Sequence, residues 1–367
     1  MNGEELDPAV VVEMLRRSAS GRVGPTINDL RSKNPTLLRP EQEMRRWRRT
    51  LFDTLASAPP TSCMAQVTPR CSGVPIRSHS IQRKRTLEPL AEGTGHVVTF
   101  KLEGDPDERP IAVAVPTGIK RHASIFFGLC GPHDSSIFAD IDTGLTCRPT
   151  KLQLLRIAYR SVLREEWAKA RAAYHHRELA SKAQKDAGTS NEAKTVALLH
   201  AYSTYEGRHA LAVRRADLGR RLASGRVGTD LVLLHRVVGR PAFAASGVFT
   251  PTHDERGRRV RSRRGKLPWA TLDVSFLDSE RALVSAVYPS IYADSSGSQL
   301  RHAFRTRDRE RFLERVWEIV LRNIENLAIS PSGWDAFSLD EQGATLDFFH
   351  RTVFNEWTSW PGLTAPI

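Results

Sequence analysis

Residues 129–141 read LCGPHDSSIFADI, and they place a cysteine and a histidine three positions apart where a helix begins. Asp134 and the serines after it suit a helix N-terminus, so Cys130 and His133 are expected on one turn. A thiolate and an imidazole held on one turn are close enough to share a tetrahedral ion. The segment therefore predicts half of a zinc site at the start of a helix.

Two earlier cysteines are expected to complete the site. Seven residues separate Cys63 from Cys71, and both precede Cys130 in a loop-rich segment with frequent Pro, Gly and Ser. We expect one structural Zn²⁺ held by Cys63, Cys71, Cys130 and His133, with Cys147 as an alternative to Cys63 or His133. Four cysteines are too sparse for a disulfide-stapled secreted domain. The competing interpretation is four unrelated buried cysteines, because free cysteine is often buried.

The periodicity outside this segment indicates an α+β fold. Two long helices are expected within residues 150–224, and the runs LVLLHRVV, PAFAASGVFT, WATLDVSFL and RALVSAVYP predict an antiparallel sheet within 227–290. HVVTFKL and PIAVAV predict two short strands inside the zinc segment. We expect an N-terminal helical region (1–60), a zinc-binding module (61–148), a helical hairpin (149–226) and a small antiparallel sheet followed by C-terminal helices (227–367).

The charge balance favours a polyanionic partner. Lys and Arg total 54 against 41 Asp and Glu, which gives a net charge of +13. A protein that neutralises phosphates releases their condensed counterions, so such a surplus suits nucleic acid. The alternative is that a high-GC bacterial genome encodes arginine often.

The basic run RGRRVRSRRGK lies between two predicted strands and contains no acid. We expect it to be an exposed loop that contacts phosphates, because the planar arginine fork suits them. The competing interpretation is a solvated loop without a partner. The candidate nucleic-acid-binding residues are Arg256, Arg258, Arg259, Arg261, Arg263, Arg264 and Lys266.

Other classes of protein lack support in the sequence. No apolar run approaches the roughly 20 residues that span a bilayer, and the acidic start is unlike a secretion signal. We therefore expect a cytoplasmic protein without membrane contact. No P-loop, dinucleotide-binding glycine motif, zincin motif or nucleophile elbow occurs.

Between the two halves of the predicted site, Cys63/Cys71 and Cys130/His133, lies SHSIQ, residues 78–82. Two zinc knuckles that bracket such an element, with a helix leaving the second knuckle, resemble the HNH (treble-clef, ββα-metal) nucleases over about residues 60–145. The resemblance implies a treble-clef zinc module in which His79 is the general base and Asp134 binds a catalytic Mg²⁺ or Mn²⁺. Before the base the family usually has Asp, Glu or His, whereas this chain has Ser78.

The sequence thus predicts a nucleic-acid-directed protein, a divergent HNH-type metal-dependent nuclease with DNA favoured over RNA. The resemblance alone suggests a bacterial defence or mobile-element system. One alternative is a non-catalytic, zinc-stapled DNA- or RNA-binding protein. Another is a scaffold subunit whose helical hairpin binds a protein partner.

Overall fold

The computed structural model describes most of the chain after residue 61. The described ranges are 62–65, 71–103, 111–189, 191–251, 253–254, 256–260, 268–294, 297–353 and 358–366. The N-terminal helical region predicted over residues 1–60 lies outside them. The chain forms two compact units, one of residues 1–61, 165–214 and 261–267, and one of residues 62–164, 215–260 and 268–367.

The second unit is built around a seven-stranded antiparallel sheet with the order β3-β2-β9-β6-β7-β8-β5. The four strand-like runs within residues 227–290 are strands, as predicted. Every residue of β6 is buried, and β7 and β8 are buried along most of their length, so side chains cover both of their faces. The strands are β2 (His96–Glu103), β3 (Ile111–Gly118), β5 (Leu231–Gly239), β6 (Phe243–Phe249), β7 (Ala270–Phe276), β8 (Arg281–Pro289) and β9 (Leu327–Ile329).

The two strands predicted inside the zinc segment form, but they belong to this large sheet. β2 pairs with β3 along its whole length and meets β9 where Val98 faces Ile329. β9 also pairs with β6, so it joins the early hairpin to the later strands. The zinc segment therefore contributes two strands to the main sheet. They join it through a pairing between residues that are far apart in the sequence.

The C-terminal helices pack on the sheet through a continuous apolar face. Asp308 caps α9 by accepting a hydrogen bond from the Arg311 amide at 2.8 Å. One face of α9 is buried, and the rings of Phe243 and Trp317 lie 4.9 Å apart between sheet and helix. The helices are α8 (Ser298–Arg305), α9 (Arg309–Asn323), α10 (Pro331–Asp335) and α11 (Leu339–Val353), with a short 3₁₀ turn η2 (Ser290–Tyr292) before them.

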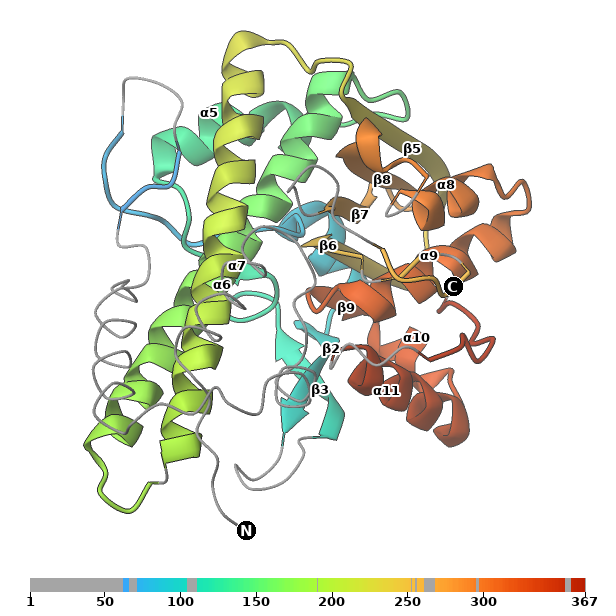
Figure 1. Ribbon diagram of the computed structural model, residues 1–367. Helices are drawn as coiled ribbons and strands as arrows, with labels where there is room; N and C mark the ends of the chain where they lie inside the picture. Colours follow the sequence, from blue (N-terminus) through green and yellow to red (C-terminus); the bar gives the residue numbers. More distant parts are fainter. Residues whose placement is uncertain are drawn as a thin grey trace. The chain divides into compact units, whose positions relative to one another are not determined.

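Residues 150–224 fold as two long helices, α6 (Lys151–Lys185) and α7 (Asn191–Ser224), drawn green to yellow in Figure 1. Asp186 makes the turn by accepting hydrogen bonds from the Gly188 amide and the Thr189 hydroxyl. Ala180 packs against Leu198 and Ala201, so the helices run antiparallel. None of the helices in the described ranges is long and apolar enough to cross a bilayer.

A second, two-stranded sheet holds the SHSIQ element. β1 (Ser78–His79) pairs antiparallel with β4 (Ile125–Phe126), so that His79 faces Ile125. α5 (Gly131–Asp142) follows β4 after a short connection. The chain between β1 and β4 contains η1 (Arg83–Leu87), α4 (Glu88–Leu90) and the β2–β3 hairpin. The mixed helices and antiparallel sheets fit the predicted α+β class.

Candidate metal centre

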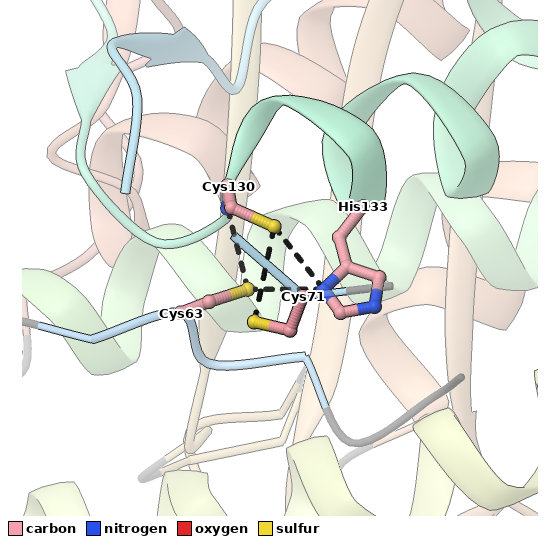
Figure 2. A group of neighbouring side chains, drawn as sticks. All are labelled: Cys63, Cys71, Cys130 and His133. Carbon is pink, nitrogen blue, oxygen red and sulfur yellow. Dashed lines mark hydrogen bonds between the residues drawn. The ribbon is translucent and has the colours of Figure 1, made fainter. Parts of the chain in front are cut away.

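The four predicted ligands come together in space (Figure 2). The ligand atoms of Cys63, Cys71, Cys130 and His133 all lie within 4.8 Å of one another. His133 Nδ1 is 3.2 Å from Cys63 Sγ and 3.3 Å from Cys130 Sγ, and the sulfurs of Cys71 and Cys130 are 3.9 Å apart. A tetrahedral zinc ion with ordinary Zn–S bonds has S···S edges of about 3.8 Å. These three separations are compatible with a tetrahedral coordination shell.

The start of α5 positions the second half of this cluster. Cys130 is the extended N-cap residue, with Pro132 in the first turn, and His133 follows one turn on. Both side chains are buried. The C-x2-H spacing therefore projects both ligands from one helix end, as predicted.

Backbone hydrogen bonds bring the first half to the second. The Ile76 amide donates to the Leu129 carbonyl at 2.7 Å, and the Cys63 amide donates to the Gly73 carbonyl at 2.9 Å. Gly73 has φ +79°, a left-handed conformation that permits the tight turn after Cys71. These bonds hold Cys63 next to Gly73 and attach the chain after Cys71 to the residue before Cys130. Both cysteines therefore reach the start of α5.

Backbone amides also point at the sulfur atoms. The Cys130 amide donates to Cys63 Sγ at 3.2 Å, and the Gly73 amide donates to Cys71 Sγ at 3.4 Å. Burial raises the pKa of Cys63 to about 11, whereas in Cys130 the hydrogen bonds outweigh burial and lower the pKa to about 6. Three thiols and one imidazole form the closed donor set of a structural zinc site.

Cys147, the alternative ligand, lies outside the cluster and accepts a hydrogen bond from Arg281 Nη1 at 2.9 Å. Across the described ranges, no other group of three histidine, cysteine or acidic residues is close enough to hold a metal ion. The described part of the chain therefore contains no second cluster of three or more such residues that could hold a metal ion.

His79 is held in one orientation by the turn before β4. Its Nδ1 lies 3.2 Å from the Ala123 carbonyl oxygen, and an oxygen of this kind only accepts, so Nδ1 carries the proton. Burial lowers the pKa of the imidazole, and the charges of Arg83, Arg77 and Arg160 lower it further. The ring is therefore neutral at neutral pH, with Nε2 as its basic nitrogen.

Asp134 lies in the first turn of α5 and is tied to the strand that carries His79. Its Oδ1 accepts a hydrogen bond from the Ser78 hydroxyl at 2.8 Å. Burial raises the pKa of the carboxyl, while the charge of Arg160 and the Ser78 bond oppose that rise. The structure thus links the two predicted catalytic residues through Ser78, the position where the family usually has an acid.

Arg160 is a residue of this region that the sequence did not single out. It lies on α6, makes a bidentate pair with Asp142 at 2.8 Å and stacks over the Phe138 ring at 4.1 Å. Asp134, Phe138 and Asp142 are spaced by four residues, so they share one face of α5. No sequence motif marks Arg160, because only the packing of α6 brings it to that face.

The strand β1 is also joined to the main sheet by buried polar groups. Ser124, at φ 60°, places its hydroxyl 2.7 Å from the Ile81 amide and 2.7 Å from Ser80 Oγ. Asn326, which is buried, donates from Nδ2 to Ser80 Oγ at 2.9 Å and to the Ser246 carbonyl at 2.7 Å. Asn326 therefore connects the residue after His79 to strand β6.

Replacing Asn326 should destabilise the protein strongly. In Asn326→Ala the Ser246 carbonyl loses its side-chain donor and Ser80 loses its link to the sheet, so we expect the free energy of unfolding to fall by about 2–3 kcal/mol. Asn323→Ala is the matched control, because Asn323 makes one bond along its own helix, to the Ile319 carbonyl. Urea unfolding followed by circular dichroism measures both, and equal losses would contradict the role given to Asn326.

Only part of the predicted basic loop lies in the described ranges. Arg258 forms an ion pair with the buried carboxylate of Asp254 at 2.7 Å. The backbone of Arg259 forms an isolated antiparallel β-bridge with that of His253. Arg256 is also described, and its amide donates to the Asp254 carboxylate at 2.9 Å. Arg261, Arg263, Arg264 and Lys266 lie outside the described residues. Nucleic-acid binding by this loop stays a prediction.

Comparison with protein-family models, curated proteins and solved structures gave no match for this chain.

Proposed function

We propose that this protein is a metal-dependent phosphodiesterase that acts on nucleic acid through a divergent HNH-type, treble-clef module. One observation carries the proposal: the helix anchored at the Cys₃His cluster presents Asp134 to Ser78, the residue before His79 in β1, and the Ala123 carbonyl orients the His79 imidazole. A pair of short antiparallel strands with a basic histidine, followed by a helix with an acid in its first turn, resembles the arrangement expected of such a module.

The zinc ion would have a structural role. Cys63, Cys71, Cys130 and His133 would fill all four positions of a tetrahedral ion and leave none for substrate. The ion would then fix the start of α5 against the loop that leads into β1. Its contribution to function would be the placement of Asp134 relative to His79.

His79 would act as the general base. Its Nδ1–H is directed to the Ala123 carbonyl, so Nε2 can take a proton from a water molecule that attacks phosphorus. The lowered pKa keeps this nitrogen unprotonated at neutral pH. Since the base must be deprotonated, activity would fall as the pH drops through this pKa.

Asp134 would hold the catalytic cation. One of its oxygens accepts from Ser78, which leaves the other to bind Mg²⁺ or Mn²⁺. Mg²⁺ typically keeps several waters and uses one or two carboxylates, so a single acid beside the substrate phosphate suits it. When bound, such a cation stabilises negative charge on the scissile phosphate.

We expect His79→Ala to abolish nicking of supercoiled DNA in Mg²⁺ or Mn²⁺. A general base typically contributes 10²–10⁴-fold in rate, so the loss should fall in about that range. His302→Ala is the matched control, because His302 is exposed on α8 and should leave the rate unchanged. A nicking rate that His79→Ala leaves intact would contradict the proposal.

Ser78 favours a second candidate function. A hydroxyl brings no negative charge to a divalent cation, so this chain offers fewer charges there than the family usually does. A non-catalytic nucleic-acid-binding protein, with zinc holding the module together, follows from that observation. Wild-type protein that binds DNA tightly without cleaving it in either metal would select this alternative.

A further inference from the structure

Five basic side chains surround the strand that carries His79. They come from three short segments: the residue before β1, the start of η1, and the turn that leads into β4. Four are exposed, and the fifth, Arg83, keeps 41% of its side chain exposed. We call this set the β1 basic rim, which consists of Arg77, Arg83, Lys84, Lys120 and Arg121.

The chain itself holds the rim close to the imidazole. Arg77 is two positions from His79, which places their Cα atoms within about 8 Å. Lys120 and Arg121 lie within three residues of Ala123, whose carbonyl contacts the His79 ring at 3.2 Å. Burial is the main cause of the lowered pKa of His79, but Arg83 and Arg77 are near enough to lower it further. The rim therefore comes from segments that flank β1 and lead into β4, and Arg77 and Arg83 act directly on the imidazole.

The positive charge of the rim is largely uncompensated. Within the described ranges, Arg77, Lys84, Lys120 and Arg121 have no ion-pair partner, while Arg83 makes a solvent-exposed pair with Glu88 at 3.3 Å.

The acids of α5 do not supply the missing negative charge. Asp140 is paired with Arg156 at 2.7 Å and Asp142 with Arg160 at 2.8 Å. Asp134, the remaining carboxylate on this helix, accepts a hydrogen bond from the Ser78 hydroxyl. Like charges grouped without partners repel one another, and a bound polyanion removes that repulsion. The rim is therefore complementary to a polyanionic ligand.

We propose that the β1 basic rim binds the phosphodiester backbone of a nucleic acid and brings it to His79. The inference rests on the proposed function for its location, but it requires binding only and not cleavage. Arginine offers a planar fork that grips a phosphate through two hydrogen bonds, and lysine adds a mobile point charge. None of these side chains belongs to the loop at residues 256–266, so the rim is a second, independent candidate for nucleic-acid contact.

The test compares two charge-matched variants of the full-length, zinc-loaded protein. The rim variant carries Arg77→Gln, Lys84→Gln, Lys120→Gln and Arg121→Gln. The control variant carries Lys101→Gln, Arg305→Gln, Arg307→Gln and Arg311→Gln, four exposed residues outside the rim. Both lose the same net charge. Fluorescence anisotropy measures binding to a short DNA duplex and to a single-stranded RNA of equal length, without divalent cation, over a series of KCl concentrations.

We expect the rim variant to bind at least about 30-fold more weakly at low salt, with a slope of log K against log[KCl] that is shallower by about 3. The control should stay within about 3-fold of wild type, with an unchanged slope. Equal weakening of both variants, or no binding of either probe by the wild type, would overturn the inference. The probe that the wild type binds more tightly assigns the ligand to DNA or to RNA.

Single substitutions keep the test valid if the quadruple variant misfolds. If the quadruple rim variant loses zinc or melts early, Lys84→Gln and Arg121→Gln should each reduce the slope by about 0.9, and unchanged slopes in both would overturn the inference. Binding that depends on the rim, in a protein that cleaves nothing, would support this inference and contradict the proposed nuclease. The two proposals can therefore fail separately.

Discussion

Cys130→Ser is expected to remove about one zinc ion per chain and to destabilise the protein severely. Cys130 occupies the N-cap position of α5, its side chain is fully buried, and its sulfur lies within reach of both Cys71 and His133. A serine hydroxyl is a poor ligand for zinc, so the ion would lose one of its four ligands, and that ligand is a buried one. Structural zinc contributes roughly 10–16 kcal/mol in small domains that depend on it, so we expect this chain to lose at least about 5 kcal/mol.

Metal analysis and thermal unfolding of the purified variants measure both effects. Cys147→Ser is the matched control, because Cys147 contacts Arg281 outside the cluster. It should retain the ion and melt close to the wild type. If the wild type is metal-free and well folded, or if Cys147→Ser loses zinc as completely as Cys130→Ser, the assignment of these four residues as a zinc site is wrong.

Asp273→Asn is expected to stabilise the protein at alkaline pH. Asp273 lies in the middle of β7, and its Oδ1 accepts a hydrogen bond from the Ser161 hydroxyl at 2.6 Å. Its Oδ2 is buried with no hydrogen-bond partner among the described residues. Burial raises the pKa of this carboxyl to about 7, although Ser161, Ser246 and Arg160 oppose the rise. Ionisation inside the fold is therefore costly.

The sign of the effect follows from the two pKa values. The carboxyl has a pKa of about 3.9 in the unfolded chain, so between about pH 4 and pH 7 the folded form retains a proton that the unfolded form has lost. The free energy of unfolding falls over that interval and levels off above it. An asparagine cannot ionise, so the variant should exceed the wild type by roughly 2–4 kcal/mol at pH 8, with a difference that shrinks toward pH 5.

Denaturant unfolding at several pH values between 5 and 8.5 measures this difference. Any metal that the Cys₃His cluster releases in acid would affect the variant and the wild type alike, so the difference between them excludes that effect. Asp335→Asn, which removes an exposed carboxylate, is the matched control. A difference between Asp273→Asn and the wild type that does not change with pH would show that Asp273 is already ionised in the folded protein at pH 5.

Local patterns in the sequence predicted most of the secondary structure. Alternating and β-branched runs gave β5 to β8, and the periodic apolar residues gave α6, α7 and α9, because these signals depend on neighbours a few residues apart. The pairing of β2 with β9 could not be predicted in this way. It joins Val98 to Ile329, and nothing in either strand specifies a partner so far along the chain.

The clustering of the candidate metal ligands was predictable for a chemical reason. Thiolate and imidazole side chains bind zinc wherever the chain places them together, and the Cys130–His133 spacing guarantees half of that placement. The choice between Cys63 and Cys147 was left open by the sequence. The backbone bonds between residues 63–76 and 128–129 decided it, because they bring Cys63 to the helix end and leave Cys147 beside Arg281.

The sequence by itself determined which residue types are available for chemistry: a Cys₃His set, one histidine in SHSIQ and one aspartate after the last ligand. Only the tertiary structure decided how they are related. Ser78 reaches Asp134, Ala123 orients His79, and Asn326 ties their strand to β6, through contacts between residues 44 to 246 positions apart. Spacing along the chain cannot encode these contacts, since each depends on how separately formed elements pack.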